Sequence, residues 1–261
     1  MQHSTVLSTF FRSAAAIGLA LSLFPGYARA DTLIVEPAEL SLSAVRPATD
    51  IVVRNPGSQE AVVNFEVRQW TQDNGRERLT PSTRLILHPE RVNIKPGDVA
   101  RIRVGLRLSG PRWEEEAFRI MVTETREVTD AGSPASLTIR RRVFQRADIP
   151  LFLRPPGRVN PRLRWSIERN PAGEVVLQAG NSGKAHVRLH SASLQGPGGH
   201  SIHKRNMSDY LLPGGTRTWV LAPDAAAGLW QLTADTNAGP MEARLELEPN
   251  MTAARALSLA P

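Results

Sequence analysis

The 261-residue sequence contains no cysteine, which excludes disulfide bonds, thiol catalysis and zinc sites built from thiolates. Only 5% of its residues are aromatic, which disfavours a sugar-binding face built from exposed rings. Lysine occurs only at Lys95, Lys184 and Lys204, so arginine carries most of the positive charge. The motifs G-x-S-x-G and H-E-x-x-H and a glycine-rich phosphate loop are also missing. We therefore expect no enzymatic activity and no cofactor.

No apolar run in the sequence is long enough to span a bilayer. The longest one, Ala14–Phe24, follows Arg12 and precedes small residues up to Ala30. This is the pattern of a cleaved secretory signal peptide, so we expect residues 1–30 to be removed and the mature chain to begin at Asp31. The alternative is an N-terminal anchor helix, which the shortness of the run disfavours. The mature protein is expected to be exported.

The formal net charge of the chain is +7. Because Arg12 and Arg29 leave with the signal peptide, the mature chain carries about +5. A basic chain can bind nucleic acid. Here the basic residues are spread along an exported chain and lack interleaved base-stacking aromatics, so we expect no nucleic-acid partner.

Almost every segment of the mature chain has the pattern of a β-strand. We predict a hairpin formed by Ile51–Arg54 and Ala61–Trp70, and a tight turn at Asn74-Gly75. Short strands separated by frequent turn signals are typical of β-sandwiches. The sequence therefore predicts an all-β fold.

A domain boundary is predicted at Pro155-Pro156-Gly157, because this tripeptide stops any strand and the strand pattern restarts after it. The length of the chain suits two domains of ordinary size. We expect one β-sandwich over residues 31–155 and a second over residues 156–261.

Histidines and carboxylates form no recognisable metal-binding or catalytic pattern. His186 and His190 are four residues apart, but they lie in a predicted strand without a neighbouring carboxylate or third ligand. We therefore predict no metal site. The run Glu114-Glu115-Glu116 is interpreted as a solvated loop end for two of its three residues.

Six motifs follow one another in an informative order. They are VRNPGSQEAVVNFEVRQW, LHPERVNIKPGDVARIRVGL, EEEAFRIMVTE, IPLFLRPPG, GNSGKAHVRL and DYLLPGGTRTWVL. This order resembles the periplasmic pilus-assembly chaperones of the chaperone–usher pathway, and the last two motifs resemble their archaic branch. The resemblance covers Leu33 to about Leu247. It implies two immunoglobulin-like sandwiches joined at an angle, like a boomerang, and a periplasmic location.

The resemblance also implies a function for the long strand that we predict over residues 135–153. Chaperones of this family lend such a strand to a pilus subunit that lacks its final strand, until the next subunit replaces it. The residues expected to enter the subunit are Leu137, Ile139 and Val143. The residues expected to hold the strand in its own sandwich are Ile149, Leu151 and Leu153.

Arginines interrupt this predicted strand. On the parity opposite to the apolar residues, we expect gatekeepers against self-pairing at Arg140, Arg142 and Arg146. Arg141 instead shares the apolar parity. A bulge between Ile139 and Val143 would turn it outward, and we favour this over an arginine in the subunit's groove, where an unpaired charge is costly.

The better-known branch of the family holds the subunit's terminal carboxylate with an arginine of the first strand and a lysine of the long strand. Glu39 and Pro150 stand at the matching positions here, so neither cation is present. A buried carboxylate still needs a cation. Arg119 is our candidate, with Arg140 or Arg142 as its partner.

Alternatives remain at two levels. Arg119 could instead form an internal salt bridge with Glu115 or Glu124.

The whole protein could be a secreted β-sandwich binding module, such as an adhesin or carbohydrate binder, or a degenerate family member without donor activity. The leading hypothesis is a periplasmic chaperone whose partners are pilus or fimbrial subunits and an outer-membrane usher, with no small-molecule substrate. Its exposed edge strand could also allow self-association.

Overall fold

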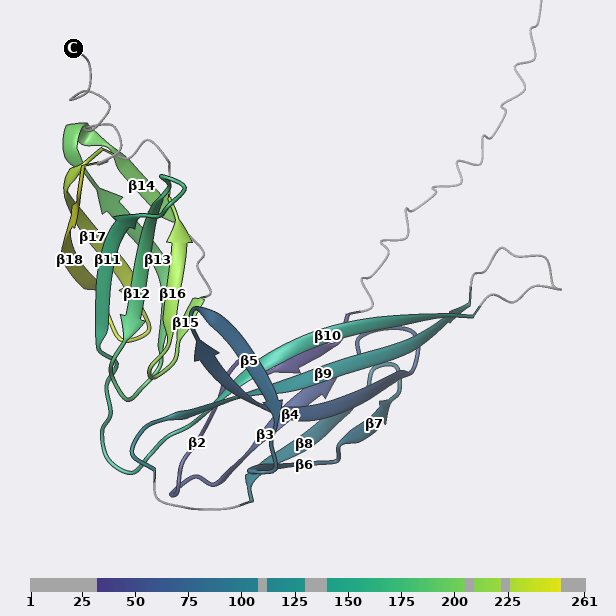
Figure 1. Cartoon of the computed structure of the whole chain (residues 1–261). Coiled ribbons are helices and arrows are strands. Elements are labelled where there is room, and N and C mark those ends of the chain that lie inside the picture. Colours follow the sequence, from purple (N-terminus) through teal and green to yellow (C-terminus); the bar gives the residue numbers. More distant parts are fainter. Residues whose placement is uncertain (1–31, 108–111, 130–139, 205–208, 222–225, 250–261) are drawn as a thin grey trace, which may run out of the picture. The chain divides into compact units, whose positions relative to one another are not determined.

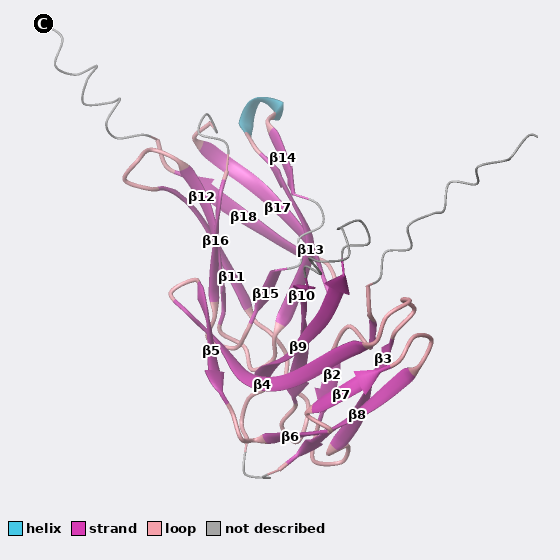
Figure 2. Cartoon of the chain, turned by 90° about the vertical axis from the view of Figure 1, so that its right-hand side faces the viewer, coloured by secondary structure: helices cyan, strands magenta, loops and turns pink. Residues whose placement is uncertain are grey.

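The computed structural model describes residues 32–107, 112–129, 140–204, 209–221 and 226–249; of residues 126–129, 140–145 and 204 it describes the backbone alone. The predicted signal peptide lies outside these ranges. The described chain is almost entirely β-structure, with a single short 3-10 turn at Pro197–Gly199 (η1). Figures 1 and 2 show the strands from two directions. The predicted all-β fold is confirmed.

Two sheets form the first sandwich. One contains, in spatial order, β1 (Ile34–Glu36), β3 (Ala48–Arg54), β8 (Val99–Leu106) and β6 (Leu85–His88). The other contains β2 (Leu40–Leu42), β10 (Arg140–Leu153), β9 (Glu116–Thr129), β4 (Ala61–Asp73) and β5 (Arg76–Pro81), with β7 (Arg91–Ile94) also paired to β4.

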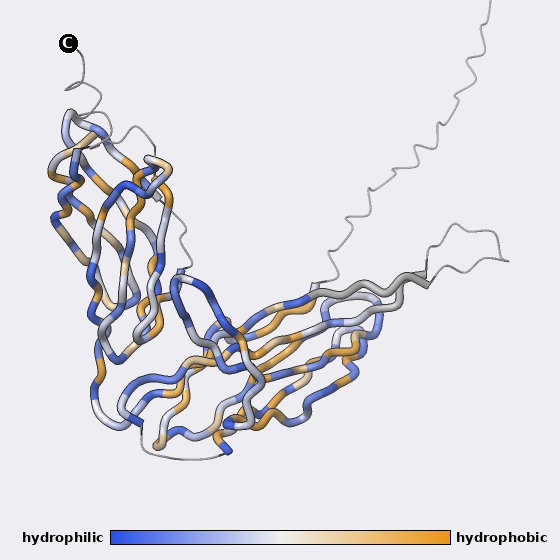
Figure 3. Tube along the Cα trace, in the orientation of Figure 1, coloured by the Kyte–Doolittle hydropathy of each residue, from blue (hydrophilic) through white to orange (hydrophobic). Residues whose placement is uncertain are grey.

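These two sheets enclose one hydrophobic core, because alternate residues of each strand point between them. Ile51 and Val53 of β3 and Phe118 and Ile120 of β9 are completely buried in the same cluster. Burying each of these side chains stabilises the fold by about 1.5–3 kcal/mol relative to leaving it exposed. The same alternation is visible as changes of colour along the strands in Figure 3.

The predicted hairpin of residues 51–70 is wrong. β3 pairs with β1 and β8, whereas β4 pairs with β5, β7 and β9, so the two strands belong to opposite sheets. Each strand has one buried face, and both faces are covered when the strands pack across the core. Asn55, at the crossing, donates from Nδ2 to the carbonyl oxygens of Gln59 at 2.7 Å and Ile94 at 2.9 Å.

The predicted turn at Asn74-Gly75 is confirmed. It joins β4 to β5, which pair from Asp73↔Arg76 onward. Asn74 has φ 49° and Gly75 has φ 76°, both in the left-handed region that suits a two-residue hairpin.

A second sandwich follows Pro155. One of its sheets contains, in spatial order, β11 (Leu163–Arg169), β12 (Val175–Asn181) and β16 (Thr216–Val220). The other contains β14 (Ser201–Lys204), β13 (Val187–Gln195), β17 (Gly228–Thr236) and β18 (Met241–Leu247), with β15 (Asp209–Leu211) also paired to β13. This sandwich has its own core, which includes the completely buried Trp230. None of the helices in the described part of the chain is long and apolar enough to cross a membrane.

Candidate functional site

The strand β10 has two unequal edges. One edge pairs with β9 along its whole length, from Arg140↔Thr129 to Leu153↔Glu116. The other edge pairs with β2 only at its end, from Leu151↔Leu40 to Leu153↔Leu42. Among the described residues, the edge over 140–150 therefore faces no strand of the chain (Figure 1). An edge of this kind can accept a strand from another molecule.

The inner end of β10 is fixed by burial. Ile149, Leu151 and Leu153 are 4%, 0% and 0% exposed and belong to the core of the first sandwich. Their alternation with Pro150 and Phe152 places the latter two on the opposite face of the sheet. The structure therefore places these three residues where the sequence expected the strand to be held.

The residues expected to enter a subunit are only partly covered. Leu137 and Ile139 lie outside the described residues. Val143, Arg140 and Arg142 lie in β10, where the backbone alone is described. Their roles stay predictions.

The expected bulge is absent from the described part of β10. Every residue from Arg140 to Leu153 faces one residue of β9, without a shift in register. Arg141 therefore keeps the same parity as Val143, because a bulge would need two residues opposite one. The sequence could not show this, since the pairing depends on β9 as much as on β10.

Arg146 is the one predicted gatekeeper whose side chain is described. Its Nε lies 2.9 Å from Asp148 Oδ1, and the two side chains are 56% and 33% exposed. The pair places charge of both signs on the surface of β10.

The cation Arg119 lies on the outer face of β9, opposite Pro150 of β10. Its guanidinium stacks 3.7 Å from the ring centroid of Trp70, and its side chain is 16% exposed. Its ion partner is Glu77 of β5, with Nη2 3.8 Å from Oε1. The alternative salt bridge to Glu115 is therefore not formed.

Glu124, the other acid considered for Arg119, lies on the opposite parity of β9. It is 3% exposed and shares this parity with the core residues Phe118, Ile120 and Val122. Neighbouring residues of a strand point to opposite faces, so Glu124 and Arg119 are on different sides of the sheet.

Two residues of this region were missed by sequence reasoning. Tyr210 of β15 faces Arg188 of β13 in the strand pairing, and the guanidinium of Arg188 lies 5.4 Å from the ring centroid of Tyr210. Arg119 lies 5.8 Å from the same ring. The sequence pattern could have indicated that Arg188 points away from the core, because it stands between the apolar residues Val187 and Leu189, which are both buried.

The hydroxyl of Tyr210 donates to Glu39 Oε2 at 3.0 Å. Burial, together with the negative charge of Glu39, raises the pKa of Tyr210 to about 12. Tyr210 is therefore a neutral donor at physiological pH. Glu39, at the position where a cation was expected from the family, instead holds a tyrosine of the second sandwich.

The first sandwich can also be compared with protein families. Residues 32–158 match the model of the PapD N-terminal domain of pili and flagellar-assembly chaperones. The matched residues comprise the first sandwich, which is therefore similar to the N-terminal domain of these chaperones. The resemblance to pilus-assembly chaperones inferred from the sequence is confirmed. No curated protein matches the sequence.

Solved structures of pilus chaperone systems have the same fold. A chain of the CsuC–CsuE chaperone–tip adhesion subunit complex from archaic Csu pili of Acinetobacter baumannii is 21% identical, with a TM-score of 0.62 over 84% of this chain and 100% of that chain. A chain of the Salmonella enterica SafA pilin–SafB chaperone complex is 16% identical, with a TM-score of 0.56 over 81% and 95%. The Pseudomonas aeruginosa CupB2 chaperone is 15% identical, with a TM-score of 0.52 over 82% and 100%.

A separate apolar cluster joins the two sandwiches. It contains Trp70, Ala117, Phe152, Tyr210 and Leu212. Gln72 of β4 ties the same region through its amide: Nε2 donates to the Tyr210 carbonyl at 2.7 Å, and Oε1 accepts from the Leu212 N–H at 2.9 Å. The amide thus pairs with the backbone of β15 and the residue after it much as a neighbouring strand would.

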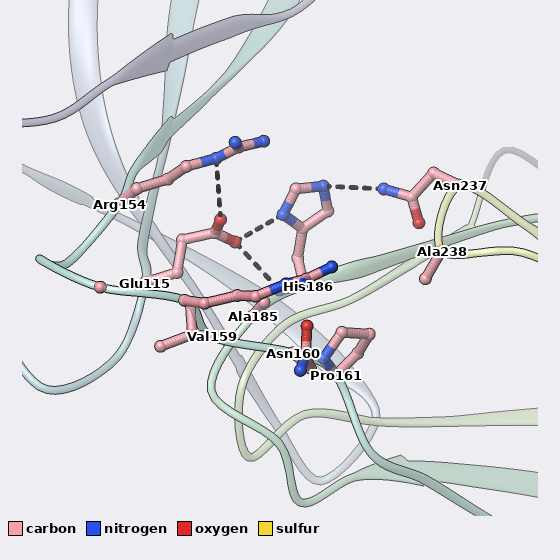
Figure 4. A pocket seen from close by; sticks show the side chains of 11 residues that line it. Glu115, Arg154, Val159, Asn160, Pro161, Ala185, His186, Asn237 and Ala238 are labelled. Carbon is pink, nitrogen blue, oxygen red and sulfur yellow. Dashed lines mark hydrogen bonds and ion pairs between the residues drawn. The ribbon is translucent and has the colours of Figure 1, made fainter. Parts of the chain in front are cut away.

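Glu115 and His186 form a second polar tie between the sandwiches (Figure 4). Glu115 Oε1 accepts from the His186 N–H at 2.9 Å and contacts His186 Nδ1 at 2.5 Å. The imidazole stacks on Phe152, with ring centroids 3.5 Å apart. Both polar side chains are almost fully buried, at 3% and 5% exposed, beside a cavity of about 470 Å³.

The expectation that two of the three glutamates are solvated needs correction. Glu114 is exposed, but Glu115 is buried against His186 and Glu116 pairs with Arg84, at 3.0 Å between Oε2 and Nε. The partners lie far away in the sequence, so the run of letters could not reveal them. The described residues contain no group of three His, Asp or Glu that could hold a metal ion.

Proposed function

We propose that this protein is a periplasmic chaperone that lends the open edge of β10 to a pilus or fimbrial subunit and delivers the subunit to an outer-membrane usher. The observation that carries the proposal is the asymmetric pairing of β10: both edges are paired at Leu151–Leu153, and one edge is paired over the rest of the described strand. Strand addition at such an edge supplies main-chain hydrogen bonds, while alternate side chains fill pockets of the partner. Leu137, Ile139 and Val143 are proposed to be those side chains.

Two fold neighbours support this role. One is a complex of a chaperone with a tip adhesion subunit, and another is a complex of a pilin with its chaperone. We extend this kind of partner, a pilus subunit, to the present chain. Release to an usher and a periplasmic location follow from the same family relation and from the predicted signal peptide at residues 1–30.

Arg119 is proposed to bind a carboxylate of the subunit. Its guanidinium is held on Trp70, and its contact with Glu77 is loose, since the nearest N–O distance is 3.8 Å. Charge-assisted hydrogen bonds to a carboxylate are usually about 2.7–2.9 Å long. Arg140 and Arg142 remain proposed partners from the lent strand.

The experiment is co-purification of the mature protein with the pilin-like subunit encoded beside it. The double substitution Leu137→Asp and Ile139→Asp should abolish recovery of the subunit and leave Tm unchanged, because charge in an apolar groove is costly. The matched control places aspartate at two exposed apolar residues of the second sandwich, Val220 and Leu229, which are 56% and 60% exposed. Recovery with the double variant equal to that with wild type would rule out the proposed register of the lent strand.

The same experiment tests the alternatives. A degenerate chaperone would recover no subunit even as wild type. A sugar-binding module would need a face of several exposed rings, but Trp70, Trp219 and Trp230 are 1%, 7% and 0% exposed. Among the described tryptophans, only Trp113 is strongly exposed, at 79%. No observation favours that alternative over the chaperone.

A further inference from the structure

The first sandwich has a window between its two sheets. In one sheet, β4 pairs with β7 over residues 61–64 and with β5 over residues 68–73, so it changes partner over residues 65–67. In the other sheet, β6 is the last strand, and among the described strands it pairs only with β8. The chain crosses between the sheets on either side of β6, through residues 82–84 and residues 89–90. β4, β6 and these two crossings frame the window.

The window opens onto the hydrophobic core. It holds a cavity of about 310 Å³, and four core side chains from both sheets line this cavity: Phe65, Val67, Leu85 and Leu87. They are 5%, 8%, 5% and 5% exposed, whereas the buried core residues of β3 and β8 are all 0% exposed. A ligand can therefore reach apolar side chains here that the rest of the sandwich covers.

The polar groups that line the window are few. Ser82 and Thr83 belong to the crossing from β5 to β6, and the acids are Glu66 and Glu90. Glu66 is neutralised by Arg68, with 2.6 Å between Oε1 and Nη2. The charge of the window therefore depends on Glu90.

Glu90 has no counter-ion within salt-bridge distance among the described residues. Its carbonyl oxygen accepts from the Phe65 N–H at 2.8 Å, which continues the pairing of β4 with β7 by one residue and places the two side chains on the same face. Phe65 belongs to the core, so Glu90 lies on the side of the ladder that faces the window. Arg91 has the opposite parity and lies on the outer face. The window therefore combines an apolar floor with one unneutralised carboxylate.

This combination selects a ligand with two different ends. The apolar floor favours a hydrocarbon chain, and the carboxylate favours a cation over an anion. Ligand pockets usually have volumes of roughly 300–1,000 Å³, so this cavity suits a small ligand. A charged group is costly to bury, so the cationic end should stay at the exposed mouth beside Glu90 while the chain lies on the floor.

We propose that the window binds a small aliphatic amine, with its hydrocarbon chain against Phe65, Val67, Leu85 and Leu87 and its ammonium group beside Glu90. In the order of the sheet, β9 lies between β4 and β10, so the ligand leaves the open edge of β10 free. The site is independent of the proposed function, and either can fail without the other.

The test titrates the mature protein with n-hexylamine, hexan-1-ol and hexanoate, which differ in the charge of the polar end. Backbone amide shifts of residues 65–67 and 85–87 in nitrogen–proton NMR spectra measure binding. Hexylamine should shift these amides saturably and bind most tightly, and hexanoate should bind most weakly. Glu90→Gln should weaken hexylamine binding about threefold and leave hexanol binding unchanged, because an ion pair at an exposed site contributes modestly. Glu60→Gln, at an exposed acid that does not line the window, is the matched control and should bind as wild type does.

A second pair of variants checks the location. Thr83→Trp places a large ring at the exposed rim and should abolish the shifts, whereas Thr80→Trp, at an exposed residue of β5 outside the lining, should not. Shifts that persist in Thr83→Trp, or that do not saturate in wild type, would mean that the probes bind elsewhere, and the inference would be wrong. Equal binding of the three probes, or an equal effect of Glu90→Gln and Glu60→Gln, would overturn the ammonium position beside Glu90.

Discussion

The two ends of β10 share the partner β9 along one edge and differ along the other edge, where the inner end pairs with β2 and the outer end pairs with no described strand. Over Leu151–Leu153 the strand lies between β9 and β2, and its apolar side chains are buried. Over Arg146–Asp148 it pairs with β9 alone, and all three residues are exposed. One continuous strand is therefore both a core element and an open edge. We therefore expect that holding the strand in the core and the proposed lending of its open edge are separate properties, which substitutions should be able to separate.

The largest effect is expected from Leu151→Ala. Leu151 is completely buried, and truncating a buried leucine should lower the free energy of unfolding by about 3–4 kcal/mol. Val143→Ala, on the same parity of the same strand, should leave it nearly unchanged and reduce subunit recovery instead. Thermal unfolding and co-purification of both variants measure the two effects. Equal losses of stability would show that β10 is a core element throughout.

The next largest effect is expected at the tie between the sandwiches. Glu115→Ala removes the acceptor of the His186 N–H and leaves buried polar groups unpaired, so it should cost about 2–3 kcal/mol of stability. Glu114→Ala changes the exposed neighbour and should cost less than about 0.5 kcal/mol. Chemical denaturation of the two variants gives the comparison. Equal midpoints for both would mean that this tie does not stabilise the fold.

These contrasts also show what the sequence could predict. The alternation of apolar residues was sufficient to predict the strands and the burial of Ile149, Leu151 and Leu153, because neighbouring residues of a strand point to opposite faces of the sheet. The Asn74-Gly75 turn was predictable because its backbone conformation depends on those two residues. The sequence could not show that β3 and β4 belong to opposite sheets. Two consecutive strands that each have one apolar face can pair side by side in one sheet or pack against each other across the core, and the local pattern is the same in both cases.

The candidate site was less predictable than the fold. Arg119 was singled out, but its contacts with Trp70, Glu77 and Tyr210 come from residues between 42 and 91 positions away in the sequence. Glu115 and His186 are 71 positions apart. Contacts of this length depend on how the sandwiches meet, and no local pattern encodes that.

A smaller, pH-dependent effect is expected at Tyr210. Its pKa is raised to about 12 in the folded protein, from 10.0 for an unperturbed tyrosine, so the folded state holds the phenolic proton more tightly than the unfolded state. The stabilisation is fully present below about pH 10 and is lost as pH rises toward 12. Tyr210→Phe should remove this part of the alkaline decline. Unfolding midpoints measured from pH 8 to 12 test it, and parallel curves for variant and wild type would contradict it.

For Arg119→Ala we expect weaker subunit binding with little loss of stability. The substitution removes a cation–π contact with Trp70 and a loose contact with Glu77, which together should be worth about 1 kcal/mol or less. Arg101→Ala, whose partner Asp50 is 3.9 Å away at an exposed site, is the control for losing a guanidinium. A fall in Tm far larger than that of the control would favour a structural role for Arg119.

The smallest effect on stability is expected from Arg146→Ala, at the exposed end of β10. Its salt bridge with Asp148 is solvent-accessible, so its loss should change the free energy of unfolding by less than about 0.5 kcal/mol. The charge has a different consequence, since charged side chains on an open edge oppose pairing with a second copy. Arg146→Ala should therefore increase self-association with rising protein concentration, which light scattering measures, while Arg164→Ala on the second sandwich should not. A monomeric Arg146→Ala variant at every concentration would mean that the edge is protected by something other than this charge.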